Sequence, residues 1–339
     1  MNILNKNILG KKFPPLLIHL YYFFIACTFC YIYLQKFISE ANFNSACDGG
    51  SIYAVITGIA CKPVQFSVLI PFLFKFLLII TFLKDKLLFV LISIIITYFI
   101  LLSFYLLLNC YFKSKAHNCW LAPIIIYPMI WNYVILNGQF FFIDFFVLLV
   151  IILGFYFIVT GKFLSLLILL FIGTLNHLSS GYLIIAYLIY NYKNILKQKV
   201  VIYTLAMLIV YISVYYILNE IYRQNAGYFI IYFLQNNIMT LKHLSVHIFL
   251  RDMIFNFGGL HIFLILYFVS GEWKKFKGPM LYINYTVIPC ILIVFIFFTM
   301  NDMRNYISGI PFILIGCLLY LSNSENSFLK PVDKLLQKN

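Results

Sequence analysis

Residues 66–112 read FSVLIPFLFKFLLIITFLKDKLLFVLISIIITYFILLSFYLLLNCYF, an almost unbroken apolar run of 47 residues. Its charged side chains are Lys75 and the cluster Lys84-Asp85-Lys86. A helix needs about 20 apolar residues to cross a bilayer, so the run is long enough for two crossings. It is equally long enough for one crossing joined to a re-entrant or interfacial helix. This choice decides on which side of the membrane every later loop lies.

The composition of the whole chain is that of a membrane protein. Of its 339 residues, 64% are hydrophobic and 10% are charged, and the mean hydropathy is +0.98. A soluble domain could not cover so much apolar surface with so few charges. The sequence therefore predicts an all-α, polytopic bundle of about ten transmembrane helices. The net charge of +14 comes from short Lys/Arg clusters between apolar runs, as the positive-inside rule expects, and it indicates no nucleic-acid partner.

The lysine clusters predict the topology. Lys6, Lys11 and Lys12 precede an apolar run to about Leu34, which we interpret as a signal-anchor helix with its N-terminus inside. Residues 36–65 then lie outside. One net crossing in residues 66–112 places Lys113-Ser114-Lys115 inside, whereas two crossings would place it outside. We prefer one crossing, because it makes the later lysine clusters cytoplasmic: Lys162, Lys193 to Lys199, Lys274 to Lys277, and Lys330, Lys334 and Lys338.

This topology gives a single transmembrane domain, residues 1–322, and a short cytoplasmic tail, residues 323–339. Both termini are then cytoplasmic, in a multi-pass protein of the cytoplasmic (inner) membrane. The further apolar segments are predicted at about 119–136, 140–160, 163–175, 178–192, 200–220, 248–270, 280–300 and 306–321. The segments 163–175 and 178–192 are short for full spans. They are expected to meet at Asn176-His177 and to form a dent in the outer surface.

On the preferred path, polar groups that are unusual in a membrane protein collect on the outer face. Ionisable residues within or beside spans are costly and by default mark function. These groups are Asp48, Asn137-Gly138-Gln139 with Asp144, Asn176-His177-Leu178-Ser179-Ser180, the loop 221–247, and Asn301-Asp302-Met303-Arg304.

The order of these features resembles the GT-C superfamily of polytopic glycosyltransferases, which use polyprenyl-phosphate-linked sugars. Asp48, in Asp48-Gly49-Gly50-Ser51-Ile52-Tyr53, occupies the place of that family's acidic residue in the first outer loop. The run Pro63 to Pro71 resembles the proline-containing segment that follows it, with Ser67 where relatives often have Arg. The resemblance covers roughly residues 15–320.

Three later stretches extend the resemblance. They are Asn137-Gly138-Gln139 with Asp144, the turn Asn176 to Ser180, and Asp302-Met303-Arg304 followed by Pro311. The turn lacks the charges that relatives often carry there. The resemblance implies a GT-C-like fold, a polyprenyl-linked sugar donor, a saccharide acceptor and membrane lipids as partners.

Sugar transfer from a lipid phosphate needs a carboxylate near the acceptor and a cation or metal to hold the phosphate. Asp48 is our candidate carboxylate, and a turn aspartate is the alternative. Asp144 is a candidate second carboxylate or metal ligand, or else a helix-entry acid. Arg304 is the candidate phosphate clamp, or an interfacial Arg paired with Asp302.

Four further residues are candidates for binding the lipid phosphate: His177, Arg223, Lys242 and Arg251. The alternatives are a satisfied interhelical histidine for His177 and ordinary surface cations for the others. His243 and His247 are four residues apart but have no acid at ligand spacing, so we assign no metal site. A divalent cation remains one way to hold the phosphate. Cys47 and Cys61 flank the Asp48 loop and form either a disulfide or two free thiols.

Three other functions compete with a GT-C-like transferase. A polysaccharide polymerase of the O-antigen or capsule type also acts on polyprenyl-linked sugars at the outer face. Residues 175–180 resemble a His-containing segment of EpsG-type polymerases. A transporter or flippase would use paired broken helices, for which the pair at 163–192 is a candidate. A membrane scaffold would have no site at all.

Overall fold

The structure is a computed structural model, and it describes residues 15–37, 52–62, 64–135, 143–227, 230–243, 245, 256–271, 286–297 and 303–323. Within these ranges the chain is helical and contains no β-strand. The helices and helical turns are α1 (Pro15–Phe37), α2 (Ile52–Thr57), η1 (Val64–Phe66), α3 (Leu69–Thr81), α4 (Asp85–Tyr111), α5 (Lys115–Leu121), η2 (Ala122–Ile125), α6 (Ile126–Met129), η3 (Ile130–Ile135), α7 (Ile143–Thr160), α8 (Phe163–Asn176), η4 (Leu178–Gly181), α9 (Tyr182–Tyr190), η5 (Tyr192–Asn194), α10 (Gln198–Ile221), α11 (Ile230–His243), η6 (Asn256–Gly259), α13 (Leu260–Val269), α15 (Val287–Phe297), η9 (Met303–Gly309) and α16 (Ile310–Asn323).

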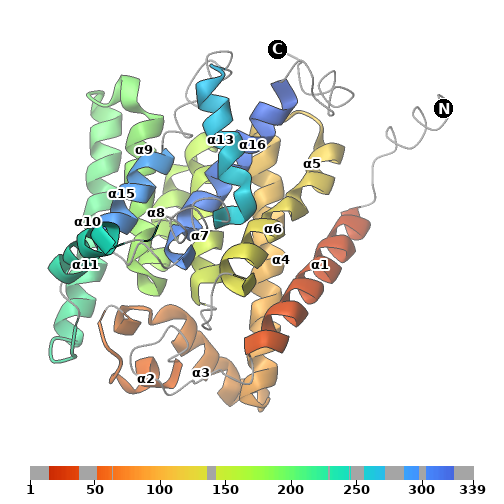
Figure 1. The fold of residues 1–339 in the computed structure, drawn as a ribbon. Coiled ribbons are helices and arrows are strands. Elements are labelled where there is room, and N and C mark those ends of the chain that lie inside the picture. The colour runs from red at the N-terminus through yellow and green to blue at the C-terminus, as the bar shows by residue number, and fades with distance from the viewer. Residues whose placement is uncertain are drawn as a thin grey trace.

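Five helical segments of the described chain are long and apolar enough to cross a membrane: Leu16–Lys36, Asp85–Tyr111, Lys115–Ile135, Ile143–Thr160 and Gln198–Ile221. Shorter apolar helices accompany them, so the predicted all-α membrane class is confirmed. In the stretch 66–112, only α4 has the length of a span. Helix α3 has 13 residues and is about 20 Å long, which is short of the roughly 30 Å hydrocarbon core. It lies with α2 at the lower end of the molecule (Figure 1).

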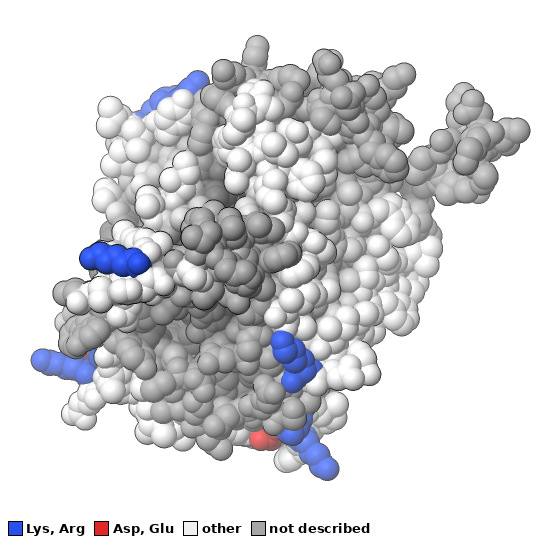
Figure 2. Space-filling view, in the orientation of Figure 1, with Lys and Arg blue, Asp and Glu red and all other residues white. Residues whose placement is uncertain are grey.

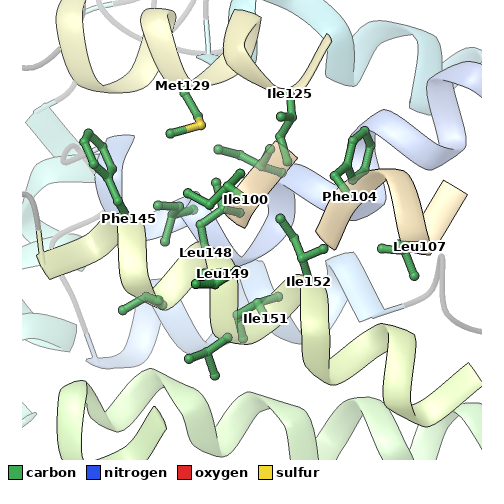
Figure 3. Packing of buried hydrophobic residues seen from close by; sticks show 14 of the residues in the cluster. Ile100, Phe104, Leu107, Ile125, Met129, Phe145, Leu148, Leu149, Ile151 and Ile152 are labelled. Carbon is green, nitrogen blue, oxygen red and sulfur yellow. The ribbon is translucent and has the colours of Figure 1, made fainter. Parts of the chain in front are cut away.

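Helix α7 is the centre of the bundle and packs against α4, α8 and α9. Its sequence is apolar on every side, as expected of a helix that is buried all round. Figure 3 shows its side chains, among them Leu148 and Ile152, meeting Ile100 and Phe104 of α4 and Met129 of α6. Lipid tails are as apolar as these residues, so close packing rather than exclusion of water holds such helices together.

Helices α8 and α9 form a hairpin on one side of α7. Helix α8 has 14 residues, which gives it a length of about 21 Å, whereas the neighbouring α10 has 24 residues and is about 36 Å long. Because α8 and α10 begin at the same end of the bundle, the turn at His177 stops about 15 Å short of the end of α10. The predicted pair of short helices meeting at Asn176-His177 is therefore present.

The recess left by this hairpin is covered by the segment around η1. Phe66 packs with Val214 and Leu218 of α10, and Leu175 and Leu178 beside the hairpin turn pack against the same cluster. The predicted depression in the surface is therefore covered by the chain itself, because residues 64–68 fill the space that the short helices leave.

Candidate functional site

The acidic side chains that the structure describes lie at one end of the bundle, whereas lysines and arginines lie at both ends. At one end, the lysine end, are Lys113, Lys115, Lys162, Lys193, Lys197 and Lys199, with no acidic residue among the described ones. The three acidic side chains that the structure describes, Asp85, Asp144 and Glu220, belong to the opposite half. We call that half the polar end and define it by Lys62, Gln65, Asp144, His177 and Arg223. Figure 2 shows Lys and Arg at the upper left, near α11 and along the lower part of this face, where a red acidic patch lies beside them.

A network of hydrogen bonds joins the segment after α2 to the end of α10. The Gln65 side chain is fully buried, its Oε1 accepts from the Ala60 N–H at 2.9 Å, and its Nε2 donates to the Val55 carbonyl at 3.0 Å. Asn225 Nδ2, just beyond α10, donates to the carbonyls of Gly58 and Ala60 at 2.7 and 2.8 Å. These bonds join segments that are more than 160 residues apart in the chain.

Lys62 belongs to the same hydrogen-bond network. Its backbone N–H donates to the Ala226 carbonyl at 2.7 Å, and an isolated parallel bridge pairs Lys62 with Gly227. Its Nζ donates to Asn219 Oδ1 at 3.4 Å and to the Arg223 carbonyl at 3.2 Å. The ammonium thus sits over the C-terminal carbonyls of α10, where the helix dipole favours a cation. Arg223 is exposed beside it and forms no ion pair with any other described residue.

The recessed turn holds the second part of the polar end. His177 has an extended backbone and caps η4, because its Nδ1 accepts from the Ser179 N–H at 3.2 Å and lies 2.8 Å from Ser179 Oγ. An accepting Nδ1 places the proton of the neutral ring on Nε2. His177 therefore caps its own turn. This arrangement is close to the alternative reading of His177 as a histidine whose hydrogen bonds are satisfied within the protein.

Asn176 and Ser180 flank this cap and are both fully buried. Asn176 Nδ2 donates to the Ile143 carbonyl at 3.3 Å, which joins the turn to the first residue of α7. Asn176 Oδ1 and Ser180 Oγ have no hydrogen-bond partner within the described chain. Buried polar atoms are nearly always paired, so these two mark a place where a water or a ligand hydroxyl would be stabilised.

The predicted site residues fall into three groups. Asp144, in the first turn of α7 and half-buried, is brought next to the hairpin turn, and its carboxylate is not without a partner. Arg223 lies at the α10 end of the same half. Lys242 is exposed in the last turn of α11, which packs on α15 instead. Arg304 lies within η9. Asp48 and Arg251 lie outside the described residues.

Two further features of the polar end involve Tyr53 and Cys61. Tyr53 donates from its hydroxyl to Asp85 Oδ2 at 2.5 Å, and burial, together with this bond and the Asp85 charge, raises the pKa of Tyr53 to about 12. Cys61 is disulfide-bonded, whereas the other described cysteines are free. Its predicted partner, Cys47, lies outside the described residues. The disulfide alternative for Cys61, rather than the free thiol, is therefore the one the structure supports.

Metal-ligating side chains do not cluster in the part of the chain that the structure describes. His243 is exposed at the end of α11, and His247 lies outside the described residues. Comparisons of the chain with protein-family models, with curated proteins and with solved structures find no match.

Proposed function

We propose that this chain is a membrane-embedded glycosyltransferase that takes a sugar from a polyprenyl-phosphate carrier at the outer face of the cytoplasmic membrane. The observation that carries the proposal is the recessed turn beside Asp144. There Asn176 bonds to the Ile143 carbonyl, one residue before Asp144, and two buried polar atoms, Asn176 Oδ1 and Ser180 Oγ, have no described partner. An acceptor hydroxyl and a sugar ring offer the hydrogen-bond donors and acceptors that such atoms require.

In this proposal Asp144 orients or deprotonates the acceptor hydroxyl, in partnership with Asp48 of the predicted first outer loop. The acceptor oxygen forms a bond to the anomeric carbon as the bond from that carbon to the carrier phosphate breaks. The phosphate leaves with the electron pair, and a guanidinium or ammonium stabilises its charge. Arg223, exposed just beyond α10, is the candidate cation among the described residues, and Arg304 is the candidate from the C-terminal part of the chain.

The side of the membrane is proposed from the bonded cysteine. The polar end contains as many described lysines and arginines as the lysine end, namely Lys36, Lys62, Lys75, Lys84, Lys86 and Arg223, so their number does not choose between the two sides. The polar end also contains the bonded Cys61, and disulfides persist in oxidising compartments outside the cytoplasm. We therefore propose that the polar end lies outside.

The proposal is tested by radiolabelled sugar transfer from a polyprenyl-phosphate sugar in membranes that contain the full-length chain. Asp144→Asn, which keeps the shape and removes the charge, is expected to lower the transfer rate by roughly 10²- to 10⁴-fold. Asp48→Ala is expected to abolish it. The matched control is Glu220→Gln, because Glu220 is an exposed carboxylate at the same end on α10, and this variant should transfer at the wild-type rate. Equal rates for all four proteins would contradict a catalytic polar end.

A lipid-linked-sugar transporter is the second candidate, because α8 and α9 form a hairpin of two short helices broken at His177. Counterflow of labelled substrate across sealed vesicles, in the absence of any acceptor, separates the two functions. A transporter accumulates label without forming a new glycosidic bond, and Asp144→Asn would then change uptake rather than product formation.

A further inference from the structure

The lysine end contains a pocket that the proposed transfer reaction does not use. It has a volume of about 310 Å³ and lies where the end of α7, the start of α8, the end of α9 and the start of α10 meet. Buried Ile158, Leu166 and Val200 contribute its apolar lining. Such a volume is at the lower limit of small-molecule sites in proteins, which are mostly apolar with a few polar groups.

The polar lining of this pocket is cationic and neutral, with no acid. Lys197 and Lys199 line it together with Asn191 and Asn194. The Lys199 Nζ lies 5.5 Å from the centroid of the Tyr203 ring, which stacks on Phe163 with a centroid distance of 3.6 Å. Neither lysine forms an ion pair with a described residue. Two ammonium groups and amide side chains around an apolar cavity are suited to a phosphate that is attached to an apolar body.

The loop beside the pocket favours a lipid over a free phosphate. Ile195 and Leu196, between Lys193 and Lys197, are 44% and 90% exposed. Apolar side chains exposed next to lysines at the end of a membrane helix are typical of chain that inserts into the headgroup region. Leu164 of α8 and Ile202 of α10 continue the exposed apolar surface away from the lysines, where acyl chains would lie.

We propose that this pocket binds the headgroup phosphate of an anionic phospholipid from the membrane leaflet that faces the lysine end. The phosphate contacts Lys197 and Lys199, the amides of Asn191 and Asn194 bind the polar part of the headgroup, and the acyl chains pass along the exposed faces of α8 and α10. The inference does not depend on sugar transfer, since it concerns the opposite end of the bundle and its readout is lipid binding.

The test uses the purified full-length chain in phosphatidylcholine vesicles that contain a small fraction of photo-crosslinkable phosphatidylglycerol. After illumination, mass spectrometry quantifies the lipid adduct on peptides that cover residues 190–203. Unlabelled phosphatidylglycerol should compete with the adduct, whereas millimolar inorganic phosphate should not. Lys197→Ala with Lys199→Ala should lower labelling at least about tenfold, because each basic side chain near an anionic headgroup adds to the affinity for that lipid.

Two further variants make the test specific to the pocket. Lys113→Ala with Lys115→Ala removes the same charge from the same end outside the pocket, and it should change labelling by less than about twofold. Asn194→Trp fills the pocket without changing any charge and should lower labelling as the double lysine variant does. The proposal is overturned if both lysine pairs lower labelling equally, if inorganic phosphate competes as well as the lipid, or if Asn194→Trp leaves labelling unchanged.

Discussion

Gln65 is the residue on which the local fold of the polar end depends most directly. Its amide is buried and satisfies one backbone N–H and one backbone carbonyl of the α2–η1 segment, and Asn225 Nδ2 lies 3.5 Å from its Oε1. An amide can both donate and accept in this way, whereas a carboxylate cannot donate and an apolar side chain can do neither. The contacts of Gln65 and Asn225 within the polar end are thus neutral hydrogen bonds.

Gln65→Leu should lower the free energy of unfolding by about 1–3 kcal/mol, because it leaves a buried N–H and a buried carbonyl without a partner. Thermal unfolding of the purified protein in detergent measures the effect. Gln198→Leu is the matched control, since Gln198 is exposed at the start of α10, and its melting temperature should stay within about 1 °C of wild type. A melting temperature for Gln65→Leu as high as that of the control would show that the hydrogen-bond network around Gln65 contributes nothing to stability.

Tyr53 predicts a dependence of stability on alkaline pH. Its folded-state pKa, about 12, is above the ordinary value of 10, so between these values the folded protein keeps a proton that the unfolded chain has lost. The stabilisation is therefore complete below pH 10 and is lost as the pH rises toward 12. Tyr53→Phe should remove this part of the slope in a plot of melting temperature against pH from 9 to 12.

Sequence reasoning at the residue scale found the polar side chains and not their partners. Asp144, Asn176 and His177 stand out as polar groups at the edges of apolar runs, and the structure brings them together at the hairpin turn. The bonds of Lys62 to Asn219 and of Asn225 to Gly58 join segments more than 150 residues apart. No local pattern predicts such pairs, because they arise from where the end of α10 happens to meet the loop after α2.

At the scale of helices, the hairpin of α8 and α9 depends on close approach at Gly173. A Cβ added there would lie 2.7 Å from both Ser180 Oγ and Val150 Cγ1. The glycine therefore lets the hairpin turn fold back on α8 while α8 packs against α7. The sequence predicted two short helices from length alone, but it could not predict that η1 would cover their turn, because that contact depends on the tertiary position of Phe66.

Gly173→Ala should lower the free energy of unfolding by about 1–3 kcal/mol, because the added methyl overpacks the contact between α7, α8 and η4. The same substitution at Gly309 is the control, since its added Cβ would meet no atom closer than 3.8 Å and should be tolerated. Denaturation in detergent, followed by the near-ultraviolet signal of the tyrosines, compares the two. Gly173→Ala as stable as Gly309→Ala would contradict the close packing of the hairpin.

On the scale of the whole molecule, composition and charge predicted the class correctly, and the helical bundle with its five candidate spans confirms it. The prediction of about ten spans depends on helices of 9–14 residues, such as α3, α8 and α9, that cannot be counted by hydropathy because they are short of the bilayer thickness. The acid-free cluster of lysines at one end, by contrast, follows from where the lysines fall between apolar runs. The bonded Cys61 at the other end is the basis of the proposed orientation.

The most direct test of the account is which side of the membrane each end faces. In a background without the other free cysteines, Ile59→Cys marks the polar end and Leu196→Cys the lysine end, and both positions are well exposed. Intact cells are treated with a membrane-impermeant maleimide before and after lysis. The account predicts that residue 59 is labelled in intact cells and residue 196 only after lysis. Labelling of residue 196 but not residue 59 in intact cells would mean that the molecule has the opposite orientation in the membrane. That result would contradict a sugar-transfer site at the outer face.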